Sequence, residues 1–298
     1  MADQMQTIKR RMKSVSNTER ITNAMKLVAA SKMKPATDRY VFVKQELKQV
    51  SDQVYSVITR TDAPEVYSTQ REGKTLYILI TGSKGLCGGY NAAVIKLAQY
   101  IKESGENACF LTLGTKGKDY CTHHDCELFW IEDRKNDGLL DVFDEAVDDW
   151  TYPQFREMSS QIMEKYRSGE ITKVVVLYTK YVNTIVQRVR RKQLFPLVPD
   201  PEVKCDTDAG VYIECEPNGA EFFDFFVEEN LALLMYRYVA EATLCEHSSR
   251  RMAMKNASDS AKEVMTELSV YYNRARQAAI TNELIEIVAG SEALSKFK

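Results

Sequence analysis

The chain has 298 residues, of which 44% are hydrophobic and 28% are charged, and its formal net charge is −2. This composition excludes a disordered chain and a uniformly basic nucleic-acid binder, and it suits one or two soluble domains with a core. No apolar run reaches the ~18 residues of a membrane span, and the N-terminus lacks the apolar segment of a signal peptide. We therefore expect a cytoplasmic protein, unless a partner holds it at a membrane.

The first 60 residues show the apolar spacing of a helix. Apolar residues recur at steps of three and four, and a six-residue gap between the first two runs predicts a locally irregular supercoil. A proline inside a helix removes a hydrogen bond and clashes with the preceding turn, so Pro35 predicts a kink or break near Lys34. The three runs are Ile8, Met12 and Val15; Ile21, Met25 and Val28; and Tyr40, Val43, Leu47, Val50, Val54 and Val57.

Residues 74–191 alternate between strand-like and helix-like patterns, which indicates an α/β domain with a largely parallel sheet. Residues 196–219 then lead back to helical sequence. We therefore expect an N-terminal helix in 1–70, an α/β domain in 71–215 and a C-terminal helix in 216–298. The predicted strands are 75–81, 108–113, 128–131, 172–179 and 184–191, and the predicted helices between them are 91–101, 116–122 and 153–167.

A glycine-rich loop, Gly82–Gly89, follows the first predicted strand. Backbone amides at the start of a helix bind anions, so such a loop could cradle a phosphate. Its sequence fits neither Gly-x-x-x-x-Gly-Lys-Ser/Thr nor Gly-x-Gly-x-x-Gly. A tight turn from strand to helix is the favoured interpretation, and a nucleotide site is the alternative.

Seven cysteines form an odd number without a secretory context, so reduced thiols are expected. Cys121 and Cys126 flank two histidines and could clasp zinc. Four ligands within six residues fit poorly around one tetrahedral ion, however, so structural cysteines are favoured. Cys205 and Cys215 flank a predicted hairpin, and a redox bridge between them is a minor alternative.

From about Phe222 onward the sequence is that of one long helix. No glycine lies between Gly219 and Gly290, and no proline follows Pro217. At 1.5 Å per residue, such a helix spans on the order of 100 Å. Apolar and small residues recur at gaps of four and three, the pattern of a coiled-coil seam. They are Leu231, Met235, Tyr238, Ala242 and Cys245, then Ala257, Ala261, Val264, Leu268, Tyr271, Ala275 and Ala278.

Matching seams predict that the two terminal helices pair with each other, most simply antiparallel. The predicted fold is a long antiparallel coiled coil with an inserted Rossmann-like α/β domain. The three histidines lie in no recognisable catalytic context, so we expect no enzymatic activity, no cofactor and no metal. Two alternatives of other classes are a nucleotide-binding adaptor with helical arms and a nucleic-acid binder with a basic arm. The first 34 residues contain eight Lys/Arg, as a nucleic-acid arm would. These residues lie on a predicted helix with an apolar seam, however, so the indication of nucleic-acid binding is weak.

Three segments resemble the gamma subunit of bacterial F-type ATP synthases. Residues 21–33 (ITNAMKLVAASKM) resemble the opening helix of that family, and residues 81–91 (TGSKGLCGGYN) resemble its first strand, turn and helix. Residues 274–294 (RARQAAITNELIEIVAGSEAL) match its C-terminal signature closely. The chain departs from the family pattern at Ser83-Lys84, Pro35 and Ser291 and in the acidic stretch 125–150.

The resemblance implies a non-catalytic rotor shaft, peripheral to the cytoplasmic face of the cell membrane, with no nucleic-acid partner. In that family the coiled coil stands inside a ring of three alpha and three beta subunits. The α/β domain rests on the membrane c-ring beside the epsilon subunit, and proton or sodium flow turns the shaft to drive ATP synthesis. The resemblance assigns rotor contacts to Met25, Lys26, Arg250, Gln277, Thr281 and Glu283. It assigns an apolar shaft tip to Ile285, Ile287, Val288 and Leu294.

Overall fold

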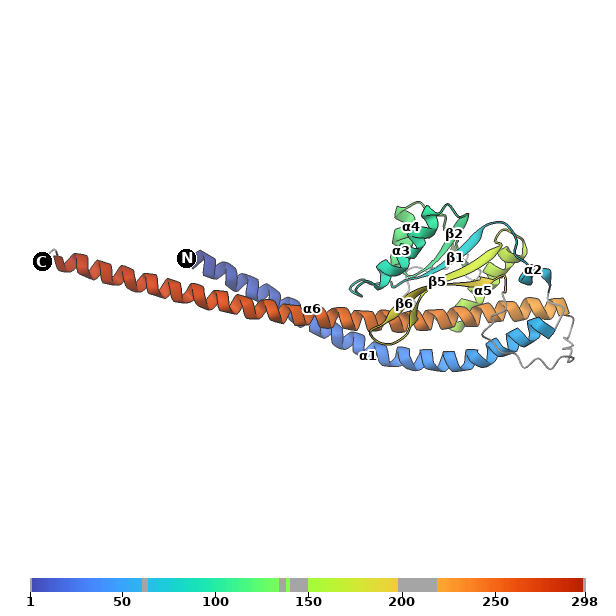
Figure 1. The fold of residues 1–298 in the computed structure, drawn as a ribbon, viewed down its shortest axis with the longest axis horizontal. Helices are drawn as coiled ribbons and strands as arrows, with labels where there is room; N and C mark the ends of the chain where they lie inside the picture. The colour runs from blue at the N-terminus through green and yellow to red at the C-terminus, as the bar shows by residue number, and fades with distance from the viewer. Residues whose placement is uncertain (1, 61–63, 134–137, 140–149, 198–218, 297–298) are drawn as a thin grey trace. The chain divides into compact units, whose positions relative to one another are not determined.

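The computed structural model describes residues 2–60, 64–133, 138–139, 150–197 and 219–296 (Figure 1). Side chains are described within 5–45, 64–131, 150–197 and 222–292. The helices are α1 (Ala2–Arg60), α2 (Glu65–Ser68), α3 (Tyr90–Glu103), α4 (Thr115–His123), α5 (Tyr152–Arg167) and α6 (Gly219–Lys296). The strands are β1 (Thr75–Ile80), β2 (Ala108–Leu113), β3 (Glu132–Asp133), β4 (Gly138–Leu139), β5 (Lys173–Tyr181) and β6 (Gln187–Phe195). Within the described residues, no helix combines the length and apolar character needed to cross a membrane.

The chain divides into two compact units. The helical unit consists of Met1–Ala29 and Arg251–Lys298, and the sheet unit consists of Ala30–Arg250. The long helices α1 and α6 each contribute to both units. The domain boundaries expected near residues 70 and 215 were placed where the sequence pattern changes, whereas the two units are defined by contacts. The expected boundaries stay a prediction.

The sheet unit contains a four-stranded sheet in the order β2-β1-β5-β6. Strand β1 pairs in parallel with β2 and β5, whereas β6 pairs antiparallel with β5. The prediction of a largely parallel sheet is confirmed, with β6 as its antiparallel edge. The predicted strand 128–131 is wrong, because the segment makes only an isolated bridge between Leu128 and Phe110.

Helices cover both faces of this sheet, which explains why its strands are apolar on both sides. Helices α3 and α4 pack on one face, where Val94, Ala98 and Cys121 meet Tyr77 and Leu79. Helices α5 and α6 pack on the other face (Figure 1). Its fully buried side chains include Ile78, Leu111, Val176, Phe155, Ile162, Leu231 and Met235.

The first predicted seam of α6 is buried, but its partner differs from the expected one. Leu231, Met235, Tyr238 and Ala242 belong to the core beneath the sheet, together with residues of α5. The face of α6 that meets α1 is different, since Leu244 packs with Ala36 and Tyr40 of α1. The prediction that the run 231–245 is a coiled-coil seam is therefore wrong: the sheet offers a larger apolar surface than one helix does.

The burial pattern of α1 forms one continuous heptad seam. Half-buried or buried positions follow alternating steps of four and three at residues 8, 12, 15, 19, 22, 26, 29, 33, 36, 40 and 43. The predicted run at Ile21 and Val28 is wrong, because these side chains are 61% and 58% exposed while Thr22 and Ala29 are buried. No phase slip occurs after Val15, since polar residues continue the seam. The last four predicted seam positions, 47–57, lie outside the described side chains.

Helix α1 continues through Pro35 as one helix. The structure therefore excludes the break that was predicted near Lys34 as one of two outcomes, whereas the other, a kink there, stays a prediction. Tertiary packing on both sides of the proline supports the helix: Met33 packs against the cluster of Ala36, Tyr40 and Leu244. This packing offsets the lost hydrogen bond, whose cost is about 3 kcal/mol in an isolated helix.

Candidate functional site

In the helical unit, α1 and α6 pack through small and polar side chains. Glu19 of α1 accepts a hydrogen bond from the Ser258 hydroxyl at 3.2 Å, and the Lys262 ammonium lies 4.0 Å from the same carboxylate. Ala29, Ala261 and Ser258 are buried. Small side chains allow two helix backbones to approach closely, so they contribute to this pairing together with the larger buried side chains of Met254 and Leu268.

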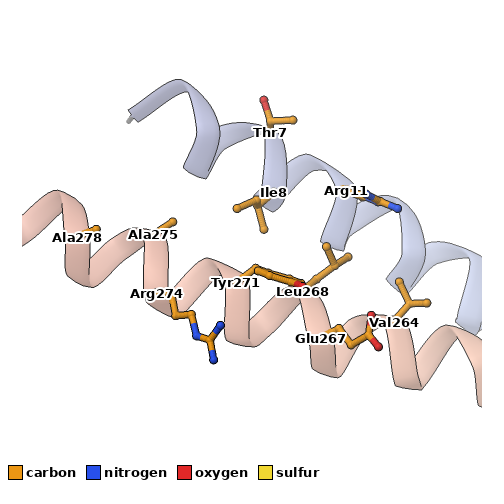
Figure 2. A pocket seen from close by; sticks show the side chains of 10 residues that line it. All are labelled: Thr7, Ile8, Arg11, Val264, Glu267, Leu268, Tyr271, Arg274, Ala275 and Ala278. Carbon is orange, nitrogen blue, oxygen red and sulfur yellow. The ribbon is translucent and has the colours of Figure 1, made fainter.

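Near the N-terminus of α1, the two helices of this unit border a groove of about 600 Å³. Figure 2 shows Ile8 pointing toward Leu268 and Tyr271 across the groove. Arg11 and Arg274 also line it. The Tyr271 side chain is 57% exposed, so the predicted seam is only partly closed at this level.

The last described part of α6 has an exposed apolar surface. From residue 281 to 292 every side chain is exposed, including Ile285, Ile287 and Val288 of the predicted tip. Leu294 belongs to α6, but its side chain lies outside the described residues. Contiguous exposed apolar residues mark surfaces that bind other molecules. This end of the helix is therefore a candidate interaction surface.

The predicted contact residues Gln277, Thr281 and Glu283 are exposed on the same stretch of helix. The Thr281 hydroxyl donates to the backbone carbonyl of Gln277 at 2.9 Å, one turn earlier. This bond is internal to α6. The polar side chains of Gln277 and Glu283 therefore extend from a helix whose backbone groups are already hydrogen-bonded.

Met25 and Lys26 are half-buried on α1, in the helical unit. Lys26 occupies a position of the continuous seam, whereas Met25 lies beside it. Exposed apolar side chains of Ile21, Leu27 and Val28 surround this pair on the outer face of the helix. Between residues 19 and 29 the seam is thus polar or small, and bulky apolar side chains lie outside it.

Arg250 lies in the sheet unit, apart from the other predicted contact residues. Its side chain is only 12% exposed and forms an ion pair with Glu246. The guanidinium also lies 3.4 Å from the Lys84 carbonyl and 3.5 Å from the Gly85 carbonyl. Arg250 therefore fastens the glycine-rich loop to α6 in this chain.

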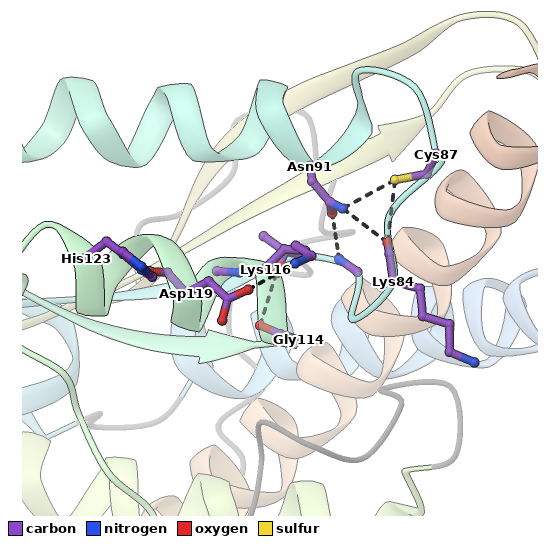
Figure 3. Close-up of polar contacts among 10 residues, drawn as sticks. Lys84, Cys87, Asn91, Gly114, Lys116, Asp119 and His123 are labelled. Carbon is purple, nitrogen blue, oxygen red and sulfur yellow. Dashed lines mark hydrogen bonds and ion pairs between the residues drawn. The ribbon is translucent and has the colours of Figure 1, made fainter.

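The loop Gly82–Gly89 is closed by the side chain of Asn91, in the first turn of α3 (Figure 3). The Asn91 side chain accepts a hydrogen bond from the Gly82 amide at 2.8 Å and donates to the Lys84 carbonyl at 3.4 Å. A Cβ atom on Gly82 would lie 2.7 Å from the carboxyl carbon of Glu246, so a larger residue there would force this side chain to move from its ion pair with Arg250. These contacts favour the interpretation of a tight turn.

The place where a nucleotide binds in doubly wound folds is occupied by α6. Ligands of such sheets bind at the carboxyl ends of the strands where the strand order reverses, here between β1 and β5. At the end of β5, the Tyr181 amide donates to Glu241 of α6 at 3.0 Å. The Cys245 thiol donates to the Thr179 carbonyl at 3.4 Å. The geometry thus favours a structural use of this edge over the nucleotide alternative.

Glu241 is a buried carboxyl that sequence reasoning missed. Burial raises its pKa above the usual value of 4.5, although the Tyr181 amide, Arg237 and Tyr40 partly oppose this effect. The Tyr40 hydroxyl donates to the same carboxylate at 3.3 Å, and burial raises the pKa of Tyr40 to about 12. Glu241 therefore links α1, the sheet and α6. A lone charge between Ala240 and Ala242 was the available sequence signal.

The structure bears on the zinc alternative for Cys121 and Cys126, but not on the disulfide alternative for Cys205 and Cys215. Among the residues that the structure describes, no three His, Cys, Asp or Glu side chains are placed to share a metal ion. The His123 ring instead contacts the Asp119 carbonyl at 2.6 Å (Figure 3). Cys205 and Cys215 lie outside the described residues.

Comparisons with known proteins agree over almost the whole chain. The family model described as ATP synthase matches residues 4–294. A gamma chain of Chlorobium phaeobacteroides is 31% identical, with 97% of this chain and 98% of that protein covered. A gamma chain of Acetobacterium woodii, described as sodium ion specific, is 32% identical, with 99% and 100% covered.

Solved structures share the fold. A chain in the F1/c-ring structure of Euglena gracilis mitochondrial ATP synthase superimposes with a TM-score of 0.68 at 16% identity, covering 99% of this chain and 95% of that one. A chain in the central stalk and c-ring structure from Tetrahymena thermophila gives a TM-score of 0.56 at 22% identity, covering 80% and 99%. Given the full-length family match and relatives above 30% identity, this chain belongs to the ATP synthase gamma chain family.

Proposed function

We propose that this chain is the central rotor shaft of an F-type ATP synthase, a non-catalytic subunit that couples ion flow to ATP synthesis or hydrolysis. The family match over residues 4–294 is the observation that carries this proposal. The exposed apolar end of α6 supports it, because such a surface requires a surrounding partner. The proposed partners are three alpha and three beta subunits, the epsilon subunit and the membrane c-ring, at the cytoplasmic face of the membrane.

The fold suits the transmission of torque. Helix α6 continues from Gly219 to Lys296 without a break, and its first part is anchored by the core beneath the sheet. Glu241 and Arg250 add polar anchors to β5 and to the glycine-rich loop. A turning force applied to the sheet unit would therefore reach α6 through a packed interface rather than through a flexible linker.

The proposed contacts with the surrounding ring divide into two classes. Met25, Lys26, Gln277, Thr281 and Glu283 would face the catalytic subunits, as polar or adaptable side chains on continuous helices. The apolar tip, Ile285, Ile287, Val288 and Leu294, would turn in an apolar bearing, where contacts lack directional hydrogen bonds. For Arg250, the ion pair with Glu246 favours a role in shaping the contact surface at the glycine-rich loop.

Co-expression with the alpha and beta subunits of the same host tests the proposal. We expect a complex of three alpha, three beta and one copy of this chain, with ATPase activity that depends on it. As a control, a chain lacking the residues after Gln277 and the N-terminal helix should lose that activity. If the full chain elutes alone and binds ATP in equilibrium dialysis, the rotor proposal fails and the nucleotide-binding adaptor takes its place.

A further inference from the structure

The end of α4 places two cysteines side by side. The helix ends in a Schellman motif, in which the Cys126 amide donates to the Cys121 carbonyl at 2.9 Å and the Asp125 amide lies 3.5 Å from the Thr122 carbonyl. Asp125 adopts the left-handed conformation that this motif requires, with φ of 49°. This motif brings two side chains into contact: that of the third-last residue of the helix and that of the second residue after the cap. Here both of those residues are cysteines.

The two thiols differ in their surroundings. Cys121 is fully buried between α4 and the sheet, whereas Cys126 is partly exposed and packs against the same cluster. Burial, and then the charge of and a hydrogen bond with Cys126, raise the pKa of Cys121 to about 12. An accessible thiol beside a buried one suits a sequence in which the first attacks a small disulfide and the second resolves the mixed disulfide that forms.

We propose that Cys121 and Cys126 are a site of reversible oxidation, forming a disulfide by exchange with the oxidised form of a small thiol. The Cys126 thiolate attacks one sulfur of the small disulfide and expels one small thiolate, leaving a mixed disulfide. Cys121 then loses its proton and attacks the Cys126 sulfur, which expels the second thiolate. Two protein thiols are oxidised, one small disulfide is reduced to two thiols, and both protons are transferred to the released thiolates or to solvent.

The consequence is local to α4. A bond between Cys121 and Cys126 fixes the last turn of the helix to its cap. The first turn of the same helix contacts the glycine-rich loop, because the Gly117 amide donates to the Thr81 hydroxyl at 2.9 Å and the Lys116 amide to the Gly82 carbonyl at 3.3 Å. The disulfide thus stiffens the helix that supports this loop.

The other described cysteines provide an internal comparison. Burial raises the pKa of Cys109 to about 12 and also raises the pKa of Cys87 and Cys245. All three are buried. Unlike Cys121, none of the three has a partly exposed cysteine among the described residues of its packing cluster to react first, so we expect them to stay reduced under conditions that oxidise the α4 pair.

The test uses the full chain with Cys205→Ser and Cys215→Ser, because these two residues could pair with each other. The folded protein is equilibrated in buffers of oxidised and reduced glutathione, quenched with an alkylating agent and mapped by mass spectrometry. We expect a peptide in which Cys121 and Cys126 are cross-linked, with the loss of two hydrogen atoms. In the same background, Cys121→Ser should instead accumulate glutathione on Cys126, and Cys126→Ser should give neither product.

Two results would overturn the proposal. In the first, the parent chain stays reduced or stops at a glutathione adduct on Cys126. In the second, the cross-link forms as readily in concentrated urea as in the folded chain, which would show that the helix cap has no part in it. Circular dichroism of each variant verifies the fold, and the result for the parent chain stands even if a variant fails to fold.

Discussion

The carboxylate of Glu241 accepts a hydrogen bond from the backbone amide of Tyr181, at 3.0 Å, where β5 ends. Tyr40 of α1 donates to the same group. Three segments that are distant in sequence therefore meet at one buried charge. An ionised carboxyl without full solvation costs free energy, and the raised pKa of Glu241 reflects that cost.

This cost predicts a pH dependence. Because the pKa of Glu241 is raised in the folded state, the folded state gains stability from protonation of this group at low pH. That contribution is lost as the pH rises from the usual value of 4.5 through the raised pKa. Glu241→Gln cannot ionise and keeps an acceptor for Tyr181. We expect the free energy of unfolding of the variant, relative to the parent, to increase over this interval, measured by urea titration between about pH 4 and 8.

The seam of α1 predicts a contrast between two alanines. Ala29 is 2% exposed in the helical unit, whereas Ala24 is exposed. Ala29→Leu should force the helices apart and lower the free energy of unfolding by about 1–3 kcal/mol. Ala24→Leu, the same change on the outer face, should alter it by less than about 0.5 kcal/mol. Equal effects of the two substitutions in urea titration would contradict the seam.

Gly114, which follows β2, differs from Gly85 in the glycine-rich loop in its tolerance of a side chain. A Cβ atom on Gly114, whose φ is 101°, would lie 2.2 Å from the Thr81 carbonyl oxygen. Gly114→Ala should therefore destabilise the sheet unit by more than about 2 kcal/mol. Gly85 has open space around its α-carbon, and Gly85→Ala should be nearly neutral. The shift of the urea midpoint in the two variants measures this difference.

The apolar tip is expected to matter for assembly of the complex but not for the stability of the isolated chain. Ile285, Ile287 and Val288 are exposed, so replacing all three by serine should leave the unfolding free energy of the isolated chain within about 1 kcal/mol. The same variant should assemble less well with alpha and beta subunits, since its bearing surface is lost. Size-exclusion chromatography of the co-expressed subunits measures assembly. Normal assembly and normal ATPase activity would argue against a role of these three residues at the tip.

A substitution at Met25 is expected to affect the coupling between ion transport and ATP hydrolysis. Met25→Lys adds a charge on α1 at the proposed sliding contact, so ion transport should fall several-fold more than ATP hydrolysis. Thr18→Lys places the same charge at an exposed position of α1 outside the proposed contact and is the control. Both rates are measured in membrane vesicles that contain the assembled complex. If Met25→Lys couples normally, the proposed contact is wrong.

The sequence predicted the long helices and the strands well, because apolar periodicity reports burial directly. Helices α1 and α6 and four of the five expected strands are present. The partner of a buried face was harder to predict: Met235 packs under the sheet instead of against α1. Periodicity shows that a face is covered, and it does not show which surface covers it.

The seam of α1 was misplaced for a related reason. Apolar residues at Ile21 and Val28 suggested the contact face, but Thr22 and Ala29 occupy it. Glu19 belongs to the seam because Ser258 and Lys262 satisfy its charge. A pattern based on hydrophobicity alone passes over a polar position whose partner lies more than 200 residues away. Extending the steps of three and four backward from Val43 would have located it.

The placement of polar side chains in the seam of α1 and apolar ones outside it has a consequence for how the sequence can evolve. Between residues 19 and 29 of α1, the contacts with α6 are made by small and polar side chains, and the bulky apolar ones of Ile21, Leu27 and Val28 are exposed. The residues that hold the pair together are therefore different from those available to another protein. Substitutions can adjust the outer surface to a changing binding partner while the two helices stay joined.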